Sequence, residues 1–161
     1  MNNTINTLRS TLIFSVLFFH SLFGVAQKDV LELLPGSGRL EYDDEFGIHR
    51  LYDNVNFKYH NNIMFCDSAY YFEKENKVRA YGNVHVIKDK TLNLFCDSLV
   101  YNGKKEKAKL WSNVRVIDSD FTLTTDTLEY DSRAEQVSYK YGGRVQSTAS
   151  PGVLTSGVGY F

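Results

Sequence analysis

Three aspartates recur at nearly constant spacing, and their carboxylates could do chemistry. Asp67, Asp97 and Asp126 lie 30 and 29 residues apart, and each precedes a Ser or Thr. A row of carboxylates could bind cations or sugars, or could supply the acid and base of a polysaccharide-cleaving enzyme. An Asp before Ser or Thr can also hydrogen-bond the backbone where a strand bends. We favour this architectural interpretation, because a catalytic group occurs once per domain and these residues recur in each repeat.

The two cysteines are also one repeat apart, at Cys66 and Cys96. An even number of cysteines in an exported chain suggests a disulfide. Equivalent positions on neighbouring stacked strands would lie ~4.8 Å apart, within the Cα range of a bridge. The alternative is a pair of small apolar core residues in register. Thr125 occupies the third equivalent position and favours this size requirement over the disulfide.

Other signatures of chemistry are missing from the sequence. It has no Gly-rich phosphate loop, nucleophile elbow or His-Glu metal motif. His49, His60 and His85 share no spacing, and no cysteine–histidine set has metal-ligand spacing. The formal net charge of −1 provides no electrostatic footprint for nucleic acid. We therefore expect a protein without catalysis, metal, cofactor or nucleic-acid partner.

The aspartates and cysteines belong to a repeat of about 30 residues. Each of three units opens with Asn-Val, reaches the Asp about 12 residues later and continues to a Tyr. The openings are Asn54-Val55, Asn83-Val84 and Asn113-Val114, and the tyrosines are Tyr71, Tyr101 and Tyr130. Repetition at a fixed period predicts stacked supersecondary units with one long interior face. Asn tolerates a left-handed backbone, so we expect each opening Asn to end a turn and begin a strand.

Apolar residues alternate with polar ones inside each unit. Val84 and Val86, then Leu92 and Leu94, show the period of two that marks strands with one buried face. Polar turns separate these runs, and about three short strands per unit are predicted. The fold class is therefore all-β, with the repeats stacked into an elongated, twisted jelly roll or β-solenoid-like stack. The predicted inner face comprises Val55, Phe57, Met64, Val78, Val84, Val86, Leu92, Leu94, Leu110, Val114, Val116, Phe121 and Leu123.

The ends of the chain differ from the repeats. Residues 1–26 combine one charged residue with an apolar run that ends in Gly24-Val25-Ala26, the pattern of a cleaved secretory signal peptide. Residues 27–37 form a lead-in, and residues 38–161 form the β-repeat domain. The sequence stops at Phe161 in mid-repeat. We expect either a fragment of a longer protein or a last strand that pairs with another chain.

These features together resemble the OstA-like or LptA-type domain family of lipopolysaccharide transport. The resemblance rests on Asn-Val-x-Val, an apolar alternation into Cys-Asp-Ser-Leu-Val-Tyr, a polar turn, and Ala-x-Leu-x-Ser before the next Asn-Val. It runs from about Gly38 to Phe161. Gly143-Arg144-Val145 departs from the opening pattern.

The resemblance implies a semi-open β jelly roll. It also implies a periplasmic bridge component whose inner face shields the acyl chains of lipopolysaccharide or a related lipid. It also implies partners, either other bridge proteins or a second copy, that pair with open strand edges near the outer membrane. Two other hypotheses remain. An exported structural β-solenoid with a filled core would show the same periodicity without a lipid ligand. A polysaccharide-cleaving enzyme would have to use the aspartate row.

Overall fold

The fold is a single antiparallel sheet that is much longer than it is wide. The computed structural model describes residues 32–36, 38–59, 61–149 and 152–160. The predicted signal peptide and most of the lead-in lie outside the described residues. No helix within the described ranges has the length and apolar character needed to span a membrane. The predicted all-β, repeat-built, semi-open architecture is confirmed.

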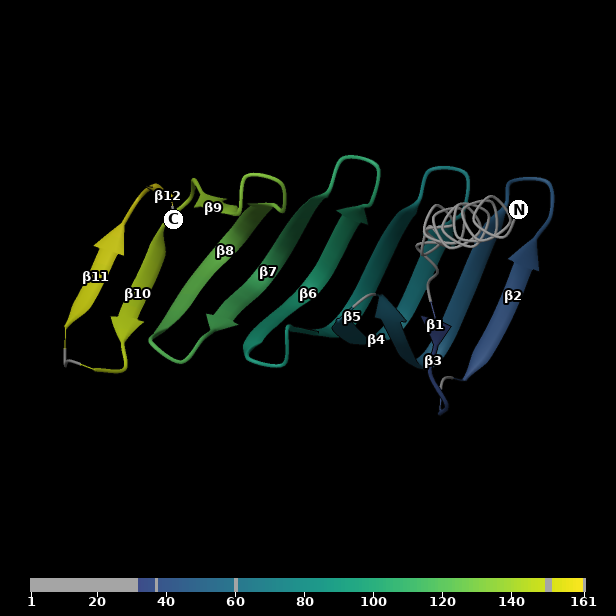
Figure 1. The fold of residues 1–161 in the computed structure, drawn as a ribbon, viewed down its shortest axis with the longest axis horizontal. Coiled ribbons are helices and arrows are strands. Elements are labelled where there is room, and N and C mark those ends of the chain that lie inside the picture. Colours follow the sequence, from purple (N-terminus) through teal and green to yellow (C-terminus); the bar gives the residue numbers. More distant parts are fainter. Residues whose placement is uncertain (1–31, 37, 60, 150–151, 161) are drawn as a thin grey trace, which may run out of the picture.

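In the described part of the chain, twelve strands make up this sheet, which does not close on itself. They are β1 (Glu32–Leu33), β2 (Arg39–Asp43), β3 (Ile48–Tyr59), β4 (Asn62–Phe72), β5 (Lys77–Lys88), β6 (Leu92–Asn102), β7 (Lys107–Ile117), β8 (Phe121–Asp131), β9 (Gln136–Tyr139), β10 (Gly143–Ser147), β11 (Val153–Ser156) and β12 (Gly159–Tyr160). The strands from β3 to β8 pair in chain order and follow one another along the long axis (Figure 1).

Strands β3, β5 and β7 are interrupted near their middles. Two consecutive residues have positive φ there, at Asp53–Asn54, Gly82–Asn83 and Ser112–Asn113. The pairing register shifts at the same points. Such bulges bend a strand and increase its twist. The expected left-handed backbone of the Asn residues is therefore present, but the prediction that each Asn begins a strand is wrong.

Each repeat consequently contains two long strands, and the prediction of three short ones is wrong. Strand β5, for example, has 12 residues and β6 has 11. The opening Asn-Val lies inside a strand, because the bulge changes the strand's direction without ending its pairing. The strands end at the polar turns of residues 89–91 and 103–106.

The bends divide the sheet into two walls that face each other. The first wall contains residues 48–52, 68–72, 77–81, 98–102, 107–111 and 127–131, with β2, β9 and β12. The second wall contains residues 55–59, 62–66, 84–88, 92–96, 114–117 and 121–125, with β1, β10 and β11. Side chains of both walls form one apolar cluster.

The two walls pack most tightly along the line of bends. Small and medium side chains fill this line, which we call the floor. Its buried members are Val55, Cys66, Val84, Cys96, Val114 and Thr125, all on the second wall. Their limited volume lets the walls meet closely at the bend, because interiors pack at near-crystalline density. Away from the floor the walls diverge.

Candidate functional site

An elongated cavity of about 420 Å³ lies between the diverging walls. Seven consecutive strands, β3 to β9, contribute to its lining. Met64, Val86 and Leu94 come from the second wall, and Val78 and Leu110 from the first. At ~4.8 Å between neighbouring strands, six steps give a length of about 29 Å. The site is therefore a narrow apolar trough that runs along the stack.

The structure places all of the predicted inner-face residues inside the apolar cluster. Nine of them line the trough: Phe57, Met64, Val78, Val86, Leu92, Leu94, Leu110, Val116 and Phe121. The remaining four are almost completely buried nearer the floor: Val55, Val84, Val114 and Leu123. Their orientation is thus the expected one, whereas their binding of lipid is a separate question.

Sequence reasoning missed most of the first wall. Leu99, Tyr101, Leu128, Tyr130 and Val137 also line the trough. For the residues on β6 and β8, the reason is that the inward-facing positions change from even to odd numbers, or the reverse, at the bend. On β6 the inward side chains are Leu92, Leu94 and Cys96, and after the bend they are Leu99 and Tyr101. A strict alternation along β6 would place Leu99 and Tyr101 on the outer face. The recurrence of this Leu and Tyr in successive repeats is the sequence signal that could have identified them.

The mouth of the trough lies opposite the floor and is crossed by two contacts between the walls. The rings of Tyr59, on the second wall, and Tyr101, on the first, have centroids 6.0 Å apart. One repeat further along, the Lys88 ammonium group lies 5.6 Å from the centre of the Tyr130 ring. All four side chains are half-buried and line the trough. We call these two contacts the clasp.

Lys88 remains charged at the mouth. Burial lowers the pKa of its ammonium group, but hydrogen bonds to Asp89 and Tyr130 more than compensate, so the pKa is raised overall. Its Nζ lies 3.2 Å from the Asp89 carboxylate. Asp118 and Glu135 also lie on the rim of the trough. The apolar interior is therefore bordered by charged groups of both signs.

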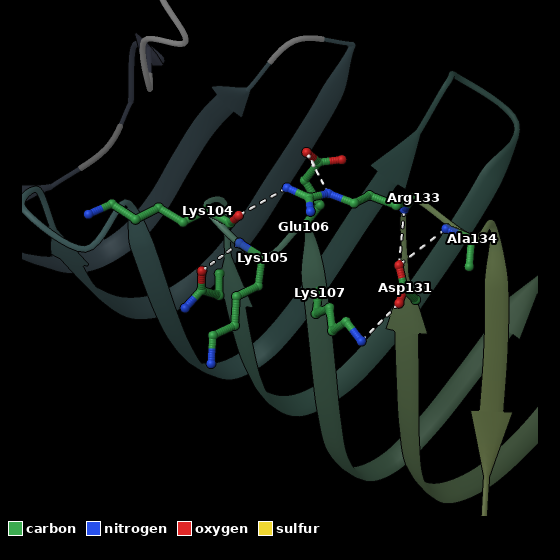
Figure 2. Close-up of polar contacts among 8 residues, drawn as sticks. Lys104, Lys105, Glu106, Lys107, Asp131, Arg133 and Ala134 are labelled. Atoms are coloured by element: carbon green, nitrogen blue, oxygen red, sulfur yellow. Dashed lines mark hydrogen bonds and ion pairs between the residues drawn. The ribbon is translucent and has the colours of Figure 1, made fainter.

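Hydrogen bonds link the turns along the first wall, one turn to the next. Gly103 N donates to Asn76 O at 2.7 Å, and Ser132 N donates to Glu106 O at 2.8 Å. Figure 2 shows Arg133 reaching back to Glu106 and to the Lys104 carbonyl, at 3.1 and 3.2 Å. This rim of the trough is braced along its length.

The recurrent aspartates lie on the outside of the bends and contact the next bulge. Asn83 Nδ2 donates to both carboxylate oxygens of Asp67 at 3.0 and 3.3 Å. Asn113 Nδ2 donates to Asp97 at 2.7 Å. The aspartate side chains thus link one strand to the next and support the bend, as the architectural interpretation expected. Their partner is an Asn side chain on the neighbouring strand, where a backbone group was expected. Among the described residues, no group of three or more His, Cys, Asp or Glu is arranged to hold a metal.

The third aspartate differs from the other two. Thr125 pairs with both Val114 and Gly143, so Gly142 occupies the position equivalent to Asn113. Glycine has no side-chain amide to donate to Asp126. The departure at Gly143-Arg144-Val145 therefore removes one step of the aspartate–asparagine ladder.

Both cysteines are free and buried. The cysteines do not lie on neighbouring strands, as the disulfide interpretation required. Cys66 lies on β4 and Cys96 on β6, with β5 between them. Two strand spacings amount to ~9.6 Å, beyond the range of a bridge. Burial raises the pKa of each thiol to about 12. Both cysteines are small buried residues of the floor, which agrees with the alternative interpretation of a size requirement.

Comparisons with known proteins agree with this geometry. A family model described as OstA-like protein matches residues 36–161. Eighteen chains of solved structures are similar. One is the crystal structure of LptH, the LptA homologous periplasmic component of the conserved lipopolysaccharide transport device from Pseudomonas aeruginosa. It is 13% identical, with a TM-score of 0.60, and the match covers 81% of this chain and 96% of that chain.

The likeness to LptH shows a shared fold. A search of curated protein sequences found no match. The family model spans the β-repeat region from before β2 to the last residue. The chain therefore belongs to the OstA-like protein family.

Proposed function

We propose that this protein is a non-catalytic, periplasmic lipid-binding component of a transport bridge, which shields the acyl chains of lipopolysaccharide during transfer to the outer membrane. The observation that carries the proposal is the trough, which is open in its interior, apolar and about 29 Å long by strand spacing. A bilayer's hydrocarbon core is ~30 Å thick, so one acyl chain spans about half that length. An extended chain fits along the stack.

The binding energy would come from area rather than from one anchor. Each methylene transferred from water to the trough contributes ~0.8 kcal/mol. The lining residues are predominantly apolar and aromatic, and the charged groups stand at the rim. This separation suits an amphiphile whose polar part stays outside. The interior cavity favours this function over a structural β-solenoid, whose core would be filled.

The edges of the sheet support the proposed bridge partners. At one end β2 pairs only with β3 among the described strands, and at the other β11 pairs only with β10. Leu40 on β2 and Leu154 on β11 are 51% and 61% exposed. An open, apolar edge is a template for a strand of another molecule. A second copy or another bridge protein would extend the trough by pairing there.

Photo-crosslinking in cells tests the lipid-binding proposal. A benzophenone amino acid would replace Leu94 or Val116, which line the trough on β6 and β7. Arg115 is the matched control, because it precedes Val116 and its guanidinium lies over the outer face of Phe95. Lys109, exposed on the first wall and paired with Glu129, is a second control.

We expect lipopolysaccharide adducts at Leu94 and Val116 and none at Arg115 or Lys109. The absence of adducts at both inner positions, in a folded and exported protein, would reject lipid binding and support the structural β-solenoid. Equal adducts at inner and outer positions would indicate nonspecific contact with membrane lipid.

A further inference from the structure

The trough is small for a lipid with several acyl chains. A cavity of ~150 Å³ accommodates benzene, which corresponds to roughly 25 Å³ per carbon atom. By this measure the 420 Å³ of the trough holds about 17 carbons. That is the content of one acyl chain. A multi-chain lipid therefore requires more space than the closed trough provides.

The clasp limits how far the mouth can widen. Tyr59 and Lys88 lie near the free ends of β3 and β5 on the second wall, and their partners Tyr101 and Tyr130 lie on the first. Both contacts span 42 residues of sequence, so they repeat with the stack. Any separation of the walls at the mouth must break them. At the floor, by contrast, the walls are joined through continuous strands.

The first wall is braced at its rim. Its turns are hydrogen-bonded to one another, so this rim moves as a unit (Figure 2). The clasp contacts are side-chain contacts between rings and an ammonium group, which break without loss of any backbone pairing. The walls can therefore separate at the mouth by breaking the clasp contacts, with the backbone hydrogen bonds of both walls left intact.

We propose that the trough in its closed form takes a single acyl chain, and that Tyr59–Tyr101 and Lys88–Tyr130 form a clasp that must release before a multi-chain lipid enters. This inference rests on the proposed lipid-binding function. The apparent affinity for a multi-chain lipid would be low, because only the small fraction of molecules with an open mouth can bind it. A single-chain amphiphile would not meet this barrier. The clasp residues thereby set ligand selectivity.

Rim variants test the first consequence. Tyr101→Ala abolishes the contact with Tyr59, and Lys88→Ala abolishes the contact with Tyr130. Binding would be measured by fluorescence with a single-chain dansyl fatty acid and, by competition, with purified lipopolysaccharide. Lipopolysaccharide affinity is expected to rise about three- to tenfold, the effect of one aromatic or cation–π contact. Because Tyr101 and Lys88 also line the trough, fatty acid affinity should stay level or fall, so the ratio of lipopolysaccharide affinity to fatty acid affinity is the quantity expected to rise.

Matched controls remove similar contacts away from the mouth. Tyr81→Ala removes an outward tyrosine that touches Tyr70. Lys109→Ala removes a lysine that lies over Trp111. Neither control should alter the affinity for either lipid. A rise in lipopolysaccharide affinity equal to that of the rim variants would refute the clasp.

A reversible tether tests the second consequence. In the double variant Tyr59→Cys/Tyr101→Cys, a bis-maleimide with a cleavable centre would join the rims. Cys66 and Cys96 are buried, so the reagent reaches the new thiols. Relative to the same double variant after cleavage, the tethered protein is expected to bind lipopolysaccharide at least about tenfold more weakly and to bind the fatty acid within about twofold of the same affinity.

The outcomes separate the two proposals. Equal lipopolysaccharide binding by tethered and cleaved protein would overturn the clasp while leaving lipid binding intact. Binding of neither lipid by the folded wild-type protein would overturn the proposed function, and the clasp with it.

Discussion

The aspartate–asparagine ladder makes a quantitative prediction at Asn113. This residue has φ of 55° and donates to the Asp97 carboxylate at 2.7 Å. Asn113→Ala removes the hydrogen bond and places a Cβ-bearing residue without a local polar contact in the left-handed region. The backbone costs about 1–2 kcal/mol, and the exposed hydrogen bond contributes about 0.5–1 kcal/mol. The variant should lose roughly 1.5–3 kcal/mol of unfolding free energy.

Asn113→Gly separates the two contributions. Glycine adopts positive φ without steric cost, so it loses the hydrogen bond and adds only the unfolded-state entropy of glycine. We expect a loss of about 1 kcal/mol, smaller than that of the alanine variant. A double-mutant cycle with Asp97→Ala should show a coupling energy of about 0.5–1 kcal/mol.

The assay is urea denaturation followed by circular dichroism or tryptophan fluorescence, with unchanged m-values as the condition for comparison. Equal losses for Asn113→Ala and Asn113→Gly would refute the backbone argument. A coupling energy near zero would show that the ladder does not stabilise the bend, and would reopen a ligand role for the aspartates.

Three further predictions follow from the same structure. Gly142→Asn should restore the missing amide beside Asp126, but Gly142 has φ of 93°, where a side chain is strained by about 1–3 kcal/mol. This strain should outweigh a hydrogen bond of about 0.5–1 kcal/mol, so the unfolding free energy should fall by about 0.5–2 kcal/mol; a gain of stability in urea would contradict it. Because burial raises the pKa of Cys66 and Cys96 to about 12 from 9.0, the unfolded chain releases these protons first. Stability should therefore fall as pH rises from about 9 to 12, by at most about 1.4 kcal/mol per pH unit for each thiol, and the slope should flatten when both are replaced by Ala. Leu123→Ala, at a side chain that is 1% exposed, should cost about 2–5 kcal/mol in the same urea assay, and a loss below 1 kcal/mol would mean that this part of the interior is loosely packed.

The fold class and the repeat can be predicted from the sequence alone. Alternation such as Val84-x-Val86 and Leu92-x-Leu94 identified strands with one buried face, because side chains of a strand alternate between two faces. The recurrence of Asn, Asp and Tyr at a constant period identified stacking. Both are local or periodic properties, which depend on the chain alone. The inner face of the second wall followed from them.

The positions of the bends, and the residues that the bends bring together, depend on contacts between strands. The bulges at Asn54, Asn83 and Asn113 turn one strand into parts of two walls, and the sequence pattern alone looked like a strand boundary. The opposite parity after the bend, which turns Tyr101 inward, depends on pairing with neighbouring strands. The separation of Cys66 from Cys96 by β5 depends on there being two long strands per repeat. The trough and its clasp arise from contacts between residues 42 positions apart, which no local pattern encodes.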